Sequence, residues 1–414
     1  MRFKTDLDQK RVEFADWLLS LCDREPNDWR LKHWKGSRRR VGSPLNWYFG
    51  EIERFSFDLG VQFSIPEAEP EEPRYNLLQQ VVKSNKLTDL MPFAFERGAV
   101  TGSVLMVFRP HEDRFYEILS YERGEYMPLE DGGWAIQYKG DDGYWTRFAV
   151  TPTAYEYYDR TKFPASQWRL TKSITHSYAE VPAIEIAHKF SGHRPEPTPG
   201  FDWISLELSA EIVSQTLASA AAFNYLGAPW VVGPDPEQLR EELAQRSQVL
   251  SGSTSTEFQD TAILGAGGMP PHHAEFMDKL SQAFADHMRV NWVPSKPPGD
   301  TSSLTLRLLY SKTIKAADRV AETYLGGVSK LLECILKAAA IDGVLADVTP
   351  TDPGSHRVRF DYEEELFAPT PAEKASLLGV VQSLIELGIR PQVALQEYYG
   401  SRTEEEIDEL LYGA

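Results

Sequence analysis

The sequence has few of the residues that define several common classes of protein. Its 414 residues include only two cysteines, Cys22 and Cys334, which lie in opposite halves of the chain. Two distant thiols exclude a disulfide framework and the cysteine clusters that hold zinc or iron–sulfur centres. No stretch approaches the roughly 18 uninterrupted apolar residues that a membrane-spanning helix needs. Met1–Asp8 has no apolar run, so we expect neither a membrane span nor a signal peptide.

Positive charge is also scarce. The chain has 43 Lys and Arg against 61 Asp and Glu, a formal net charge of −18. Tight nonspecific binding to duplex DNA needs cations that displace counterions from the phosphates, so this charge disfavours it. The charge is compatible with a few local DNA contacts, or with a surface along which DNA passes without adhering. The short basic run Arg38, Arg39 and Arg40 indicates either a phosphate or partner contact, or a solvated turn whose arginines pair with nearby acids.

The first 200 residues are expected to form an α/β block. The length and an ordinary apolar content of 42% predict a globular chain of more than one domain. Apolar residues recur at helical spacing over 11–22, 44–57 and 75–98, the last with a break or kink expected at Pro92. Short apolar runs separated by turn residues predict an antiparallel meander. Its strands are expected at 103–108, 115–120, 134–138, 144–150 and 154–158. Two more strands are expected at 167–174 and 183–188, before Pro195–Gly200 breaks the chain.

The character of the chain changes at Asp202. This residue is a favourable N-cap for a helix that runs to about Leu226, and small side chains at its centre would let another helix approach closely. Short apolar runs at 230–233 and 261–264 predict strands in a small mixed insert. A second helix is expected over 273–291, where one apolar stripe recurs at helical spacing.

The longest predicted element follows a proline-rich loop. Three prolines in Pro294–Asp300 forbid a helix there. A helix is then expected from about Ser302 to Ile341, with a kink at Gly326–Gly327. Its apolar stripe has heptad spacing, typical of a helix packed along its length; the stripe is Ala317, Ala321, Tyr324, Val328, Leu331, Ile335 and Ala338. A strand at 357–362 and an acidic helical tail at 372–411 complete the prediction.

The sequence shows no motif for catalysis or cofactor binding. Gly265–Gly268 lacks the Lys-Ser/Thr of a phosphate loop and the spacing of a dinucleotide fingerprint, so it indicates a turn. His273 and His287 lie about four helical turns apart, too far to share one metal ion. Asp286 beside His287 is one local acid–base pair of a kind that chance explains. We therefore expect no enzyme activity, no catalytic residue, no metal and no cofactor.

The order of the elements resembles the portal protein, or head-to-tail connector, of tailed bacteriophages. Four segments resemble parts of that family: Arg38–Leu45 leading into a helix, Phe95–Leu105 as helix, turn and first strand, Val181–Ile186 as the strand before the stem, and Val358–Phe360 as the closing strand. The resemblance implies an α+β fold with named parts. These are a wing (1–200), two stem helices (201–227 and 273–293), a clip (228–272), a tunnel loop (294–301), a long kinked helix returning to the wing (302–368) and a crown (369–414).

The resemblance also implies a function and partners. Portals of this family form a dodecamer, a ring at one capsid vertex through which double-stranded DNA is packaged and ejected without sequence-specific contacts. The implied partners are the terminase large subunit, the head-tail adaptor, the major capsid protein and a scaffold protein, with no membrane. The implied location is the portal vertex of the virion, after assembly in the host cytoplasm. The implied contact residues are Ser295, Lys296, Pro297, Pro298, Gly299 and Asp300, facing DNA, and Gly252, Ser253, Thr254 and Ser255, facing the adaptor.

Two other functions remain open at this point. The chain could be a cytoplasmic enzyme with an α/β domain and a helical lid, which a cluster of titratable residues in one pocket would favour. It could also be a different virion adaptor protein. Adaptors are usually shorter and lack a helix of about 40 residues, so the length of the predicted helix argues against this alternative.

Overall fold

The computed structural model describes most of the chain and shows a mixed α and β fold, as predicted. The described residues are 6–20, 43–66, 68–69, 72–112, 115–140, 142–162, 168–178, 180–191, 194–226, 230–232, 262–264, 271–292, 302–345, 356–362, 379, 382–383 and 385–386. The helices are α1 (Asp6–Leu19), α2 (Pro44–Ser56), α3 (Pro73–Ser84), α4 (Leu87–Thr101), α5 (Trp203–Leu226), α7 (Pro271–Met288), α8 (Ser303–Leu309) and α9 (Ser311–Ile341). Of the predicted tail, only positions between 379 and 386 are described, and these are helical.

The strands form two larger sheets and three two-stranded ones. The five-stranded sheet is an antiparallel meander of β4 (Tyr126–Pro128), β5 (Trp134–Lys139), β6 (Trp145–Val150), β7 (Ala154–Tyr158) and β8 (Leu170–Thr175). The three-stranded sheet has the order β3 (Phe115–Glu122), β2 (Ser103–His111) and β9 (Ala183–Ala187). The pairs are β1 (Val61–Ser64) with β14 (Arg359–Tyr362), β10 (Lys189–Ser191) with β11 (Arg194–Thr198), and β12 (Trp230–Val232) with β13 (Ala262–Leu264).

The predicted meander is divided between two sheets, because β2 and β3 pair with each other and not with β4 to β8. The chain leaves the five-stranded sheet after β8, and β9 pairs with β2, where Ser103 lies opposite Ala187. The backbone N–H of His188 extends this pairing by donating to the carbonyl of Gly102, at 2.9 Å. The first six residues of β2 are all buried, which suits a central strand covered on both faces.

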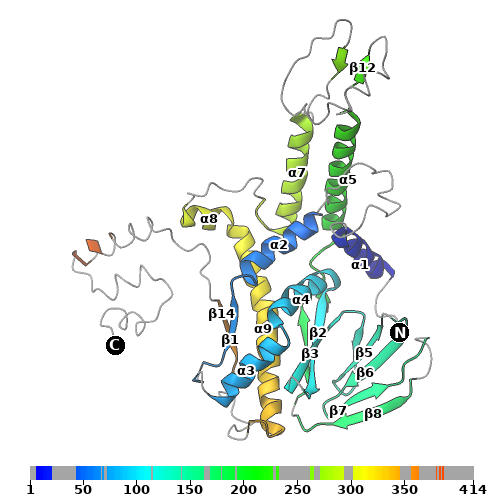
Figure 1. Cartoon of the computed structure of the whole chain (residues 1–414), viewed down its shortest axis with the longest axis vertical. Helices are drawn as coiled ribbons and strands as arrows, with labels where there is room; N and C mark the ends of the chain where they lie inside the picture. The colour runs from blue at the N-terminus through cyan, green and yellow to red at the C-terminus, as the bar shows by residue number, and fades with distance from the viewer. Residues whose placement is uncertain are drawn as a thin grey trace.

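Helix α9 is the axis of the body. It packs against α2, α4, β9 and β14, and Figure 1 shows it running the length of the body between helices and sheets. All seven residues of the predicted heptad stripe are buried, so the prediction of a helix packed along its length is confirmed. The C-cap residue Asp342 fixes its end, since a carboxylate oxygen accepts hydrogen bonds from Tyr116 at 2.8 Å and Tyr178 at 2.7 Å.

The long element does not break at Gly326–Gly327. Helix α9 is continuous through both glycines, and the break in the long element falls at Tyr310, between α8 and α9. Gly327 instead allows a close approach of strand to helix, because a Cβ there would lie 2.7 Å from two side-chain carbons of Ile186. At the true break, the ring of Tyr310 is buried against Phe55, with ring centroids 5.2 Å apart.

Two prolines were also misjudged. The break expected at Pro92 lies at Asn85 and Lys86, and Pro92 sits inside α4. Asn85 ends α3 because its amide donates to the carbonyls of Val81 and Tyr116, both at 2.9 Å, and accepts from the N–H of Ile118. The stretch from Pro195 forms part of β11 and does not simply break the chain. Proline is tolerated there because β11 is an edge strand of a two-stranded sheet, where not every N–H has to donate to a partner strand.

Helices α5 and α7 form a slender pair that projects from the body (Figure 1). They lie side by side, and the hairpin β12–β13 stands at their far end. The base of α5 is tied to the body by Arg11, whose guanidinium donates to the carbonyls of Val100 and Phe201 at 3.0 and 2.9 Å. The predicted helix starting after Asp202 is confirmed, and the carboxylate of Asp202 accepts the N–H of Ser205 at 2.9 Å as an N-cap.

Candidate functional site: a cation-lined cavity below the projecting helices

The contact residues predicted from the sequence cannot be placed. The DNA-facing group Ser295, Lys296, Pro297, Pro298, Gly299 and Asp300 lies outside the described residues. The same holds for the basic run Arg38, Arg39 and Arg40, and for Gly252, Ser253, Thr254 and Ser255. The structure instead draws attention to a cavity that sequence reasoning did not find.

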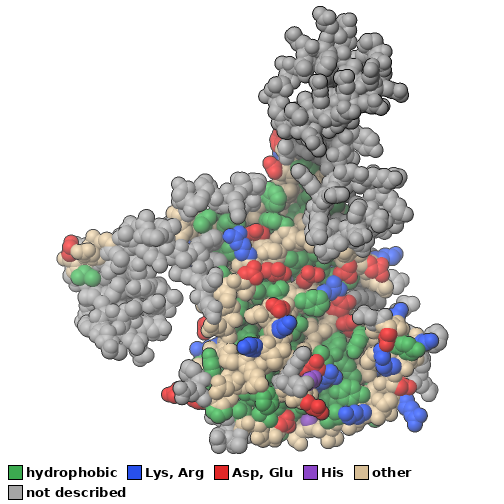
Figure 2. Space-filling view, in the orientation of Figure 1, with side chains coloured by type: hydrophobic (Ala, Val, Ile, Leu, Met, Phe, Trp, Pro, Cys, Tyr) green, Lys and Arg blue, Asp and Glu red, His purple; other side chains and the backbone are tan. Residues whose placement is uncertain are grey.

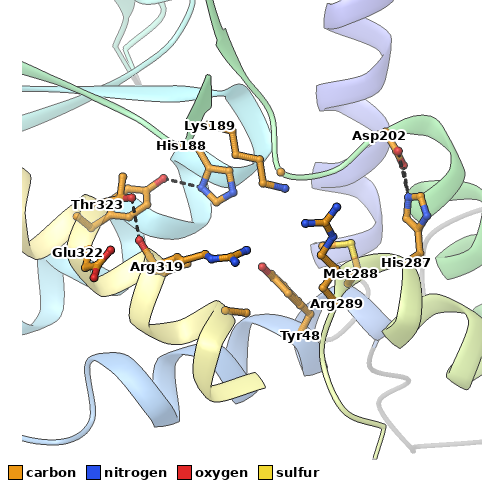
Figure 3. Close-up of a pocket in the computed structure, with 14 residues that line it drawn as sticks. Tyr48, His188, Lys189, Asp202, His287, Met288, Arg289, Arg319, Glu322 and Thr323 are labelled. Carbon is orange, nitrogen blue, oxygen red and sulfur yellow. Dashed lines mark hydrogen bonds and ion pairs between the residues drawn. The ribbon is translucent and has the colours of Figure 1, made fainter. Parts of the chain in front are cut away.

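The cavity lies where the projecting pair meets the body. Its volume is about 640 Å³, within the range of small-molecule sites. Its walls come from α2, β10, the start of α5, the end of α7 and the middle of α9 (Figure 3). The lining residues include Tyr48, His188, Lys189, Gly200, Asp202, His287, Met288, Arg289, Arg319, Val320, Glu322, Thr323 and Tyr324.

Three cations from three separate elements point into this cavity. Lys189 comes from β10, Arg289 from the residue after α7, and Arg319 from α9, and Figure 3 shows their head groups converging. Among the residues that the structure describes, none of the three head groups has a hydrogen-bond or ion-pair partner. Burial and the charges of Arg289 and Arg319 lower the pKa of Lys189, and the charge of Asp202 only partly opposes them. The cavity therefore brings three cations together beside two acids, Asp202 and Glu322.

Arg289 occupies a backbone position that usually belongs to glycine. Its φ of 59° is left-handed, and it ends α7 in a Schellman motif. In this motif the N–H of Arg289 donates to the backbone carbonyl of Asp286 at 3.2 Å, and the N–H of Val290 donates to the backbone carbonyl of Ala285 at 2.9 Å. A residue with a Cβ costs about 1 kcal/mol here relative to glycine. Arg289 also lines the cavity, and strained residues of this kind cluster at functional sites.

The back wall of the cavity is neutral and tightly packed. His188 Nδ1 lies 3.1 Å from the hydroxyl of Tyr324. Burial, with a contribution from Lys189, lowers the pKa of His188 to about 3, so its ring is uncharged at neutral pH. Gly98 and Gly200 leave room for this pair, because a Cβ at Gly98 would collide with the Tyr324 hydroxyl and one at Gly200 would lie 2.6 Å from His188 Nε2.

One of the two acids at the cavity is already engaged. His287 Nε2 lies 2.9 and 3.0 Å from the two carboxylate oxygens of Asp202, which also caps α5. The hydrogen bonds from Ser205 and His287 outweigh burial and lower the pKa of Asp202. Glu322 also borders the cavity, three residues after Arg319 on α9. Asp202 thus joins α5 to α7, and neither acid forms an ion pair with the three cations.

The sequence carried faint signals of this site. The end of α7 has no glycine or asparagine at the position after Met288, where such a residue is usual. Nothing in the sequence could bring Lys189, Arg289 and Arg319 together, since they are far apart in the chain and meet only in the tertiary structure. The Asp286–His287 pair was noted, but His287 binds Asp202, and Asp286 pairs with Lys312 at 2.9 Å.

The described residues contain no further candidate of two common kinds, a metal site or a membrane-spanning helix. No group of three or more His, Cys, Asp or Glu placed to hold a metal occurs among the described residues, and none of their helices is long and apolar enough to cross a membrane. No family model and no curated protein matches the chain. A solved structure similar over 90% of both chains, at 12% identity and a TM-score of 0.36, comes from the "virion of native gene transfer agent (GTA) particle". A likeness at that TM-score carries no argument about function.

Proposed function

We propose that this chain is a portal protein of a tailed bacteriophage, a non-enzymatic subunit of a ring that forms the DNA channel at one capsid vertex. The observation that carries the proposal is the projecting pair of α5 and α7, closed at its far end by the hairpin β12–β13. The order of elements around the pair adds support, because the long α8–α9 element follows the pair and then leads to β14, which pairs with β1 near the N-terminus.

The sides of the projecting pair suit contacts between copies. Ile204 on α5 is 57% exposed and Phe276 on α7 is 44% exposed. Exposed apolar side chains on a slender element gain free energy when another surface covers them. The second half of α5 is rich in Ala and Ser in the sequence, which favours close helix packing. Head-to-tail contacts of one such surface with a different surface of the next copy generate a ring when the rotation closes.

The charge of the chain fits passage of DNA. Each copy carries a formal charge of −18, and Figure 2 shows Asp and Glu side chains gathered in a band across the upper part of the body on the face in view. A channel with excess negative charge repels phosphate and limits adhesion. Under this proposal double-stranded DNA passes through the channel without sequence-specific contacts, and the partners of the chain are the terminase, the head-tail adaptor and the capsid.

Negative-stain imaging and native mass measurement of the purified chain test the proposal. We expect rings of about twelve subunits with a central hole wide enough for duplex DNA. The double variant Ile204→Gln with Phe276→Gln should lose the rings while keeping the circular dichroism and melting temperature of the parent, since both side chains are exposed. Val344→Gln is the matched control, because Val344 is 43% exposed after the far end of α9 and should leave rings intact. Monomers or dimers of the parent at all salt and protein concentrations would overturn the proposal.

A further inference from the structure

Three cationic side chains line the cavity without forming an ion pair with a described residue. Lys189, Arg289 and Arg319 reach the same space from β10, α7 and α9, and within the described chain their head groups have no partner. Like charges held close together repel, so an anion that joins Lys189, Arg289 and Arg319 would be bound favourably. The strained backbone of Arg289 shows that the fold keeps a guanidinium at a place where glycine would be easier.

We propose that this cavity binds a phosphate group carried by a molecule larger than phosphate itself. Two guanidinium groups and an amine approaching from different elements can surround the oxygens of a tetrahedral oxyanion, and arginine forms paired hydrogen bonds with phosphate. The proposal does not depend on ring assembly, because every lining residue belongs to one copy of the chain.

The rest of the cavity indicates what accompanies the phosphate. A volume of about 640 Å³ exceeds what an inorganic ion needs and matches the sites of small organic ligands. Tyr48, Met288 and Val320 provide an apolar wall beside the cations. The phosphate can belong to a small phosphorylated molecule or to the phosphodiester backbone of a nucleic acid strand, and both present the same oxygens to the cations.

Binding of inorganic phosphate and of a short DNA duplex to the full chain tests this site. Calorimetry at constant ionic strength, with acetate as the anion control, should detect phosphate binding to the parent. Arg289→Gly should weaken that binding roughly tenfold, the loss of one charge-assisted contact, while its melting temperature stays equal or rises because glycine relieves the left-handed backbone. Arg319→Gln should weaken it similarly. Lys330→Gln removes a cation from an exposed position on α9 that does not line the cavity, and should have no effect.

Chemical labelling of Lys189 gives an independent readout at the site itself. Because the pKa of Lys189 is lowered, its amine reacts faster with an acetylating reagent than ordinary surface lysines do. Phosphate should protect Lys189 in the parent and fail to protect it in Arg289→Gly. If inorganic phosphate protects Lys189, a small phosphorylated ligand is sufficient; if only the duplex protects it, the source is nucleic acid. No binding and no protection by either probe, or binding that the Arg289 and Arg319 variants leave unchanged, would overturn the proposal.

Discussion

The body of the molecule and the projecting pair of helices are stabilised in different ways. In the body, α9 is surrounded by α2, α4, β9 and β14, and each residue of its heptad stripe is buried. In the projecting pair, α5 and α7 pack mainly on each other, and Ile204 and Phe276 stay exposed. The body therefore has its own core, whereas the pair presents surface that a neighbour could cover.

The body and the projecting pair therefore tolerate different kinds of substitution. In the body, the volume of each side chain matters, because interiors are packed as densely as organic crystals. In the pair, the polar contact at the base matters more, since Asp202 both caps α5 and holds His287 of α7. Substitutions that distinguish these regions test the comparison directly.

The largest effect is expected from truncation of the core stripe. Leu331→Ala removes a fully buried side chain of α9 and should lower the free energy of unfolding by about 2–5 kcal/mol. Leu308→Ala makes the same chemical change on α8, where the side chain is 67% exposed, and should stay within about 0.5 kcal/mol of the parent. Urea denaturation followed by circular dichroism measures both. Equal losses in the two variants would show that α9 does not form the core of the body.

A smaller effect, with opposite signs at neighbouring positions, is expected from the glycines of α9. Gly327→Ala places a Cβ against Ile186 and should destabilise the body by about 1–3 kcal/mol. Gly326→Ala meets no atom within 4 Å and should stabilise the helix by about 0.5–1 kcal/mol. The same denaturation experiment checks both substitutions. A loss of stability in Gly326→Ala would contradict the structure, in which β9 packs against Gly327 and leaves the space beside Gly326 empty.

The smallest effect is expected at the base of the projecting pair. Asp202→Ala should cost about 1 kcal/mol, the usual value of an N-cap, while Asp202→Asn keeps a capping side chain and should cost less. Because the pKa of Asp202 is lowered in the folded chain, its stabilisation is complete above the unfolded pKa of about 3.9 and is lost as the pH falls through the folded pKa. Unfolding measured between pH 6 and pH 3 should show a shallower loss in Asp202→Asn than in the parent. Parallel curves would mean that the carboxylate charge contributes nothing there.

Much of the fold could be predicted because the patterns are local. The heptad stripe, the Asp202 cap and the alternation of the strands each depend on residues close together in the sequence. The predictions failed where contacts between residues far apart in the sequence determine the local structure. Gly326 and Gly327 suggested a kink on composition alone, yet the second glycine is explained by Ile186, which is distant in the sequence. Pro92 suggested a break that the hydrogen bonds of Asn85 place seven residues earlier.

The candidate site could not be predicted for the same reason. Lys189, Arg289 and Arg319 are unremarkable in their own segments, and only the tertiary structure makes them neighbours. The residues that the family resemblance assigned to DNA and adaptor contacts lie outside the described parts of the chain and stay predictions. Charge counting also concealed the site, because a net charge of −18 says nothing about where cations gather.

The pairing of β1 with β14 has a consequence for how the chain acquires its structure during synthesis. Val61 lies opposite Tyr362, so two strands separated by about 300 residues must find each other. Contacts of such long sequence separation raise the contact order and slow folding. A ribosome must release residue 362 before β1 gains its partner. Val61–Ser64 therefore emerges about 300 residues before the strand that it pairs with.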